Sequence, residues 1–288
     1  MKSRTLASRA VPVPQPHRPG KPENIQDDGG SRGIPGPGIL LPWPYPLRIH
    51  TLGRFQVTLD GQVSRFSGKA QRRPLLILHA LLARGGRPVP VSHLRKLLGE
   101  AEGLDDAPCS RGAFDMALSR LRHLLPVPGL LCLGDDALSL DEDRVWVDAW
   151  ALDRRLGRVA GPGTPARRLA LLGRALDLYE GEFLPGNDSA PVLLARERLH
   201  ARLLRVARHL GEDFEARGDW SGAGGLYERL REHYPLDENL CLHLLRSHLR
   251  RDQQAQARGL YDRCRALMAR VLGVLPGLEI RRLMESLS

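Results

Sequence analysis

Cysteine is scarce in this chain of 288 residues. The four cysteines are far apart, with no CxxC pair and no histidine at zinc-finger spacing: Cys109, Cys132, Cys241 and Cys264. We therefore expect reduced thiols and neither a disulfide framework nor a metal site.

Long apolar runs are missing as well. No stretch approaches the roughly 20 apolar residues that a helix needs to cross a bilayer. The first residues also lack the cationic and then apolar pattern of a signal peptide. The sequence therefore predicts a cytoplasmic protein with no membrane partner.

Motifs of catalysis and nucleotide binding are absent too. There is no GxSxG, SxxK or HExxH, and Gly68-Lys69 lacks the glycine spacing and the following Ser or Thr of a phosphate-binding loop. Acid pairs such as Asp135-Asp136 fall in predicted turns, where aspartate serves the backbone. We predict that the protein is not an enzyme, has no catalytic residue and uses no cofactor.

Lysine contributes little to the formal net charge of +10, because arginine supplies nearly all the cations. A basic balance suits nucleic acid, but a genome-wide coding preference for arginine would raise the charge equally well. The distribution is more informative, since Asp60 is the only acid between Leu47 and Gly99. Such a one-sided stretch is typical of a surface that faces phosphates.

Residues 1–46 are rich in proline and glycine, which predicts a disordered tail. Its cations suit non-specific contact with DNA. A tail without function and a mis-assigned start codon are the alternatives.

Residues 47–147 predict a strand pair, three helices and a hairpin. Phe55, Val57 and Leu59 alternate with polar residues before an Asp60-Gly61 turn. A helix starts at Pro74 and stops at Gly85-Gly86. Ser92 is expected to cap a second helix that directs three leucines to one side, namely Leu94, Leu97 and Leu98.

The third predicted helix begins at Arg111 and is amphipathic. Its apolar stripe consists of Phe114, Ala117, Leu118, Leu121 and Leu125. A hairpin around Gly134-Asp135-Asp136 follows. This order of elements is typical of an α+β winged helix-turn-helix, which lays one helix in the major groove of DNA.

Residues 148–288 predict an all-α domain. Asp148 is the expected cap of its first helix. "LYERL" recurs as "LYDRC", which places Tyr227 and Tyr261 34 residues apart, the period of tetratricopeptide helix pairs. "LDLYEGEFLPG" and the long segment after it fit an earlier, irregular repeat. We expect the tyrosines and Trp220 in the core, and Trp146 and Trp150 at the join between the domains.

Several motifs, in order, resemble one bacterial family across about residues 47–285. "LRIHTLGRFQV", "GKAQRRPLLILHALLA", "ALSRLRHLL" and "VWVDAWAL" resemble the winged helix of activators of the antibiotic-regulatory-protein (SARP) type, itself similar to that of OmpR-type regulators. "LYEGEFLPG", "RERL" and "GLYERLREHYPLDE" resemble the bacterial transcriptional activator domain that follows it. One departure is Leu98-Gly99, where family members usually carry Trp-Pro.

The predicted DNA-binding face is the polar side of the third helix. A solvated helix face is the alternative, but the position of the helix and the resemblance favour DNA contact. The residues are Arg111, Asp115, Ser119, Arg120, Arg122 and His123. Three cations that precede the first helix are candidate phosphate contacts, with ordinary solvated charge as the alternative: Lys69, Arg72 and Arg73.

An acidic loop follows the second helix, and phosphates would repel it. The resemblance implies that it touches RNA polymerase; a solvated loop is the alternative. Its residues are Glu100, Glu102, Asp105 and Asp106.

The sequence thus predicts a sequence-specific transcriptional regulator, most simply an activator. The resemblance implies binding to promoter repeats, so we expect a homodimer on DNA. The alternative is an adaptor that holds a protein partner with tetratricopeptide-like helices and whose winged helix does not read DNA.

Overall fold

The computed structural model describes residues 45–64, 71–101, 103 and 107–286. These residues belong to one compact unit. Nearly all of the predicted tail, together with Lys69, Glu102, Asp105 and Asp106, lies outside the described residues.

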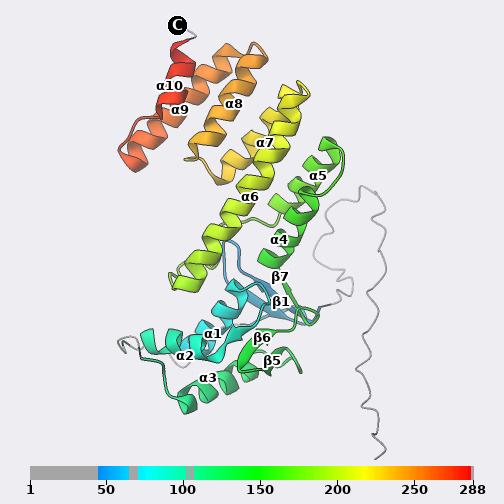
Figure 1. Ribbon diagram of the computed structural model, residues 1–288, viewed down its shortest axis with the longest axis vertical. Helices are drawn as coiled ribbons and strands as arrows, with labels where there is room; N and C mark the ends of the chain where they lie inside the picture. The colour runs from blue at the N-terminus through cyan, green and yellow to red at the C-terminus, as the bar shows by residue number, and fades with distance from the viewer. Residues whose placement is uncertain (1–44, 65–70, 102, 104–106, 287–288) are drawn as a thin grey trace, which may run out of the picture. The chain divides into compact units, whose positions relative to one another are not determined.

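A four-stranded sheet opens the described chain (Figure 1). Strands β1 (Leu47–His50), β2 (Gln56–Leu59) and β3 (Gln62–Ser64) pair antiparallel in sequence order. Asp60 and Gly61 form the predicted turn between β2 and β3, both with positive φ. Strand β7 (Val145–Val147) joins β1 in parallel, so the predicted strand pair is part of a larger sheet.

Three helices follow: α1 (Arg72–Ala83), α2 (Val91–Glu100) and α3 (Arg111–Leu124). Helix α1 starts two residues before Pro74, which is tolerated because N–H groups in the first turn have no intrahelical partner. The prediction that Ser92 caps α2 is wrong, since Pro90 occupies the cap position and Ser92 lies inside the helix. The Val91 N–H instead donates to the Asp136 carbonyl at 2.8 Å.

The predicted hairpin is confirmed. Strands β5 (Leu131–Gly134) and β6 (Ala137–Leu140) pair antiparallel, and β4 (Val89–Pro90) adds to β6. Asp135 and Asp136 both have positive φ, at 50° and 54°. Two successive residues with positive φ match the right-handed twist of the strands that they join.

The rest of the described chain is helical. Tyr227 and Tyr261 take the same place in α7 and α9, so their spacing marks two successive helix pairs. Tyr227 is fully buried, whereas Tyr261 is partly exposed. The helices are α4 (Asp148–Val159), α5 (Pro165–Leu176), α6 (Ala190–Ala216), α7 (Trp220–His233), α8 (Glu238–Arg250), α9 (Gln254–Leu272) and α10 (Leu278–Glu285).

The segment between α5 and α6 corrects one expectation. "LYEGEFLPG" lies mostly outside the helices and forms a loop that docks on the end of β1, instead of completing a helical repeat. The Leu184 N–H donates to the Thr51 carbonyl at 2.7 Å, and the Gly53 N–H donates to the Glu182 carbonyl at 2.9 Å. Gly53 has φ +76°, and a Cβ there would lie 2.8 Å from the Glu180 carbonyl carbon. This contact therefore requires glycine.

The "RERL" segment of α6 holds that loop and the end of α1. The Arg196 guanidinium donates to the carbonyls of Phe183 and Leu184, each at 3.2 Å. Arg198 donates to the carbonyl of Ala83, the last residue of α1, at 2.9 Å. The indole N–H of Trp150 donates to Leu82 next to it, so the prediction that Trp150 packs at the join is confirmed.

Asp148 fastens the start of α4 to the chain beyond β1. Its carboxylate is buried and accepts hydrogen bonds from the Thr51 N–H at 2.8 Å, the Thr51 hydroxyl at 2.6 Å and the Leu52 N–H at 3.0 Å. The predicted cap role is wrong, because Val147 holds the cap position and Asp148 is the first helical residue. The carboxylate serves a segment 97 residues away in sequence.

Replacing this carboxylate should destabilise the whole fold. Asp148→Asn places an NH₂ group among donors, so we expect the free energy of unfolding to fall by about 2–4 kcal/mol. Urea unfolding of the full chain measures it. The exposed Asp262→Asn on α9 is the matched control. Equal stability of Asp148→Asn and the wild type would contradict this account of the join.

A partly buried histidine of α1, His79, lies against the segment before α6. The His79 Nδ1 is 2.7 Å from the Asn187 amide nitrogen, and its Nε2 has no hydrogen-bond partner among the described residues. The Phe55 ring packs edge-on against the imidazole. Burial lowers the pKa of His79 to about 4, because the charged ring would lose its hydration.

Acid should therefore weaken the fold through His79. The unfolded chain binds this proton near pH 6.5, whereas the folded chain binds it only near pH 4. The contribution of neutral His79 to the free energy of unfolding is therefore fully present above pH 6.5 and decreases as the pH falls from 6.5 to 4. Through His79 alone, we expect the free energy of unfolding to fall by about 2 kcal/mol from pH 7 to pH 5. Comparing the pH dependence of unfolding in wild type and His79→Gln measures it, with the exposed His123→Gln as control. Identical pH profiles for the wild type and His79→Gln would contradict the assignment.

Candidate nucleic-acid interface

Helix α3 is held by a cap and an apolar stripe. The Ser110 hydroxyl accepts from the Ala113 N–H at 3.2 Å, which satisfies one free donor of the first turn. The predicted stripe is confirmed: Phe114, Ala117, Leu118 and Leu121 are buried, as is Leu125 just beyond the helix. The stripe packs against α1 and α2, which leaves the opposite face of α3 outward.

All six residues predicted on the polar side of α3 are exposed. Within the described part of the chain, the guanidinium groups of Arg111, Arg120 and Arg122 make no hydrogen bond or ion pair. The Nδ1 of His123 lies 2.8 Å from the Ser119 carbonyl oxygen. The arginines therefore present uncompensated positive charge to solvent.

The connection from α2 to α3 is tightly fixed at its end. The Arg95 Nε donates to the Cys109 carbonyl, and the Cys109 N–H donates back to the Arg95 carbonyl, each at 2.9 Å. A Cβ on Gly99 would lie 1.9 Å from the Ala107 carbonyl oxygen. Leu98 is buried beside it, so the returning backbone lies directly over the end of α2.

Two hollows border the polar face of α3. One, of about 410 Å³, separates the first turns of α2 and α3 from the β5–β6 turn and is lined by Arg111 and Asp115. The other, of about 310 Å³, is lined by Arg122 and residues 125–131. Arg111 and Asp115 thus line a hollow at the start of α3, and Arg122 lines one at its end.

The predicted phosphate contacts on α1 are placed differently. Arg72 is exposed and lines a third hollow together with Glu100 and Asp188. The sequence predicts DNA as the partner of Arg72 and RNA polymerase as the partner of Glu100, yet both residues line the same hollow. Arg73 is partly buried and has an interaction of its own.

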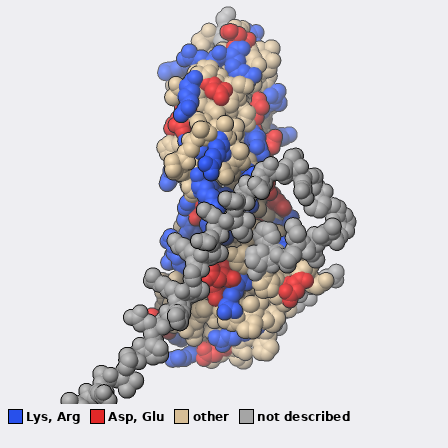
Figure 2. All heavy atoms as spheres, turned by 90° about the vertical axis from the view of Figure 1, so that its right-hand side faces the viewer, with Lys and Arg blue, Asp and Glu red and all other residues tan. Residues whose placement is uncertain are grey.

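Charge is otherwise spread out. On the face that Figure 2 presents, basic and acidic side chains are interspersed along the helical part of the chain. Net charge therefore does not by itself locate a nucleic-acid surface; the unpaired arginines of α3 do so better. Across the described ranges, no helix is long and apolar enough to span a membrane.

Comparison with known proteins identifies a domain and a relative. Residues 147–288 match the family described as the bacterial transcriptional activator domain. The chain is 31% identical over 280 residues to the regulatory protein AfsR of Streptomyces coelicolor, an alignment that covers 93% of this chain and 25% of AfsR. It thus spans about a quarter of the length of that relative.

A solved structure is also similar to this chain. EmbR of Mycobacterium tuberculosis, in complex with a low-affinity phosphopeptide, superposes with a TM-score of 0.56 at 25% identity. The superposition covers 83% of this chain and 64% of EmbR. Together with the motifs, these likenesses support a transcriptional regulator of the SARP type.

Two glycine substitutions should act in opposite directions near α3. Gly99→Ala forces a methyl group onto the Ala107 carbonyl, so we expect a loss of about 1–3 kcal/mol in stability. Gly112→Ala has open space in the first turn of α3 and should gain up to about 1 kcal/mol from helix propensity. Thermal unfolding measures both. A neutral Gly99→Ala would show that the backbone over it is not fixed.

Proposed function

We propose that the chain is a sequence-specific DNA-binding regulator that reads promoter DNA through α3. In this proposal α1, α2, α3 and the β5–β6 hairpin form a winged helix-turn-helix, with α3 as recognition helix and the hairpin as wing. The observation that carries the proposal is the exposed polar face of α3, whose arginines have no partner in the described chain. An unpaired, solvated guanidinium can pair with a base edge without breaking an existing ion pair.

The side chains on this face match the chemistry of base edges. The planar fork of an arginine holds the O6 and N7 atoms of guanine together. Asp115 is able to accept from a cytosine amino group, and Ser119 from a base or a phosphate. Lys69, Arg72 and Arg73 are proposed as phosphate contacts, which fix the register of the protein on the duplex but carry no sequence information.

Further partners extend the proposal. A single recognition helix reads few base pairs, so we propose that two copies bind repeated sites as a homodimer on DNA. Glu100, which the structure places at the end of α2, together with Glu102, Asp105 and Asp106 is the proposed contact with RNA polymerase, and activation is the proposed outcome. We further propose that residues 47–147 and 148–288 act as separate functional domains, and that the second mediates dimerisation.

The test is binding of the full chain to duplexes selected from genomic fragments. Arg120→Ala or Arg122→Ala should weaken binding to the selected duplex by about 1–3 kcal/mol where the residue reads a base. That is roughly 5- to 150-fold in Kd. Arg217→Ala, an exposed arginine at the end of α6, is the charge-matched control and should bind as the wild type does.

A scrambled duplex and a salt series complete the design. An equal loss on both duplexes would show phosphate contact instead of base reading. Affinity should fall steeply with salt, because binding releases counterions from DNA. No binding of the full chain to any duplex would refute the proposal and favour the adaptor function.

A further inference from the structure

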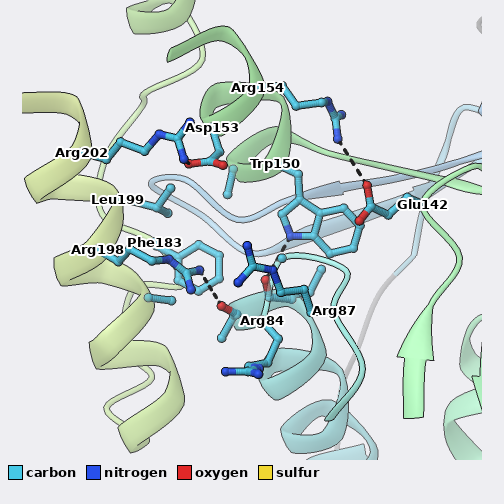
Figure 3. Close-up of a pocket in the computed structure, with 15 residues that line it drawn as sticks. Arg84, Arg87, Glu142, Trp150, Asp153, Arg154, Phe183, Arg198, Leu199 and Arg202 are labelled. Carbon is cyan, nitrogen blue, oxygen red and sulfur yellow. Dashed lines mark hydrogen bonds and ion pairs between the residues drawn. The ribbon is translucent and has the colours of Figure 1, made fainter. Parts of the chain in front are cut away.

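A second cationic site lies outside α3 and contains none of its residues. A cavity of about 220 Å³ opens where the end of α1 meets α4 and α6 (Figure 3). Its apolar wall includes Leu82, Trp150, Phe183 and Leu199. These wall residues come from both the α+β part of the chain and the helical part.

Arginines dominate the polar lining. The lining contains five arginines and two acids, Glu142 and Asp153, so its formal charge is +3. The arginines are Arg84, Arg87, Arg154, Arg198 and Arg202. Like charges held together raise the free energy of the empty cavity, and a bound anion would relieve that repulsion.

The acids are already engaged by two of the arginines. Asp153 pairs with Arg202 at 3.1 Å, and Glu142 lies 3.9 Å from Arg154. Arg198 is positioned by its hydrogen bond to the Ala83 carbonyl, which uses one of its five N–H donors. Two arginines therefore remain for a ligand, together with the free donors of Arg198.

Those two arginines, Arg84 and Arg87, belong to the loop after α1. Both are exposed, and neither makes a side-chain hydrogen bond or ion pair within the described residues. Figure 3 shows Arg87 beside the Trp150 ring, with Arg198 reaching in from α6. Arg87, from the loop after α1, and Arg198, from α6, thus bring guanidinium donors to one cavity from two elements, an arrangement suited to a multiply charged oxyanion.

We propose that this cavity binds a small anion that carries a diphosphate group, held by Arg84, Arg87 and Arg198. The volume fits a small anion and is too small for a macromolecule. The ligand would contact α1 and α6 at once and would therefore stabilise the join between the α+β and helical parts of the chain. The site is independent of the proposed DNA-reading face, because it uses none of the residues of α3.

The test is calorimetric titration of the full chain with inorganic pyrophosphate. The wild type should bind one equivalent, and its unfolding midpoint should rise with pyrophosphate concentration. Arg84→Ala and Arg87→Ala should each weaken binding by about tenfold, because each removes a charge-assisted contact. Arg217→Ala makes the same change in net charge outside the cavity and should bind as the wild type does.

A parallel titration with ADP separates two sources of the diphosphate. Tighter binding of ADP than of pyrophosphate would assign the diphosphate of a nucleotide, and weaker binding would assign free diphosphate; both support the site. No binding of either, or equal weakening by Arg217→Ala, would overturn the proposal. It would also be overturned if duplex DNA displaced pyrophosphate while Arg84→Ala and Arg87→Ala lost DNA affinity, since the arginines would then serve the DNA backbone.

Discussion

A buried carboxylate sets the relation between the two parts of this chain. Asp148 accepts hydrogen bonds from Thr51 and Leu52 at the point where β1 has ended and α4 begins. Charge buried in this way is tolerated only where donors surround it, so the backbone at Thr51 is fixed in one position. The Thr51 carbonyl in turn accepts a hydrogen bond from the Leu184 N–H of the docked loop. The sheet, α4 and that loop thus meet at a single hydrogen-bonded centre.

Three of the motifs that resemble the family have structural roles in this arrangement. "VWVDAWAL" supplies Asp148 and Trp150, "LYEGEFLPG" supplies the docked loop, and "RERL" supplies Arg196 and Arg198. Each of these segments connects elements that are distant in sequence. The polar face of α3 takes no part in these connections, which leaves its arginines available for a partner outside the chain.

Local patterns in the sequence predicted local structure well. The 3.6-residue period gave the buried stripe of α3, and Gly134-Asp135-Asp136 marked the hairpin. Long-range pairing carried no such signal: the parallel partnership of β1 with β7 and the docking of the loop after α5 depend on contacts about 100 or more residues apart. The predicted Ser92 cap was wrong because α2 begins at Val91, directly after Pro90 of β4, whose pairing with β6 depends on the fold. The exposure of the α3 arginines and the gathering of arginines around the cavity needed the fold.

The proposed function rests on the polar face of α3, which would select DNA sequence. Genome-wide mapping of bound sites in cells tests it most directly, with wild-type protein compared with the Arg120→Ala, Arg122→Ala double variant at equal abundance. We expect the wild type to occupy a limited set of promoters that share a repeated motif, and the double variant to lose them. Unchanged occupancy of the same promoters by the double variant would contradict it.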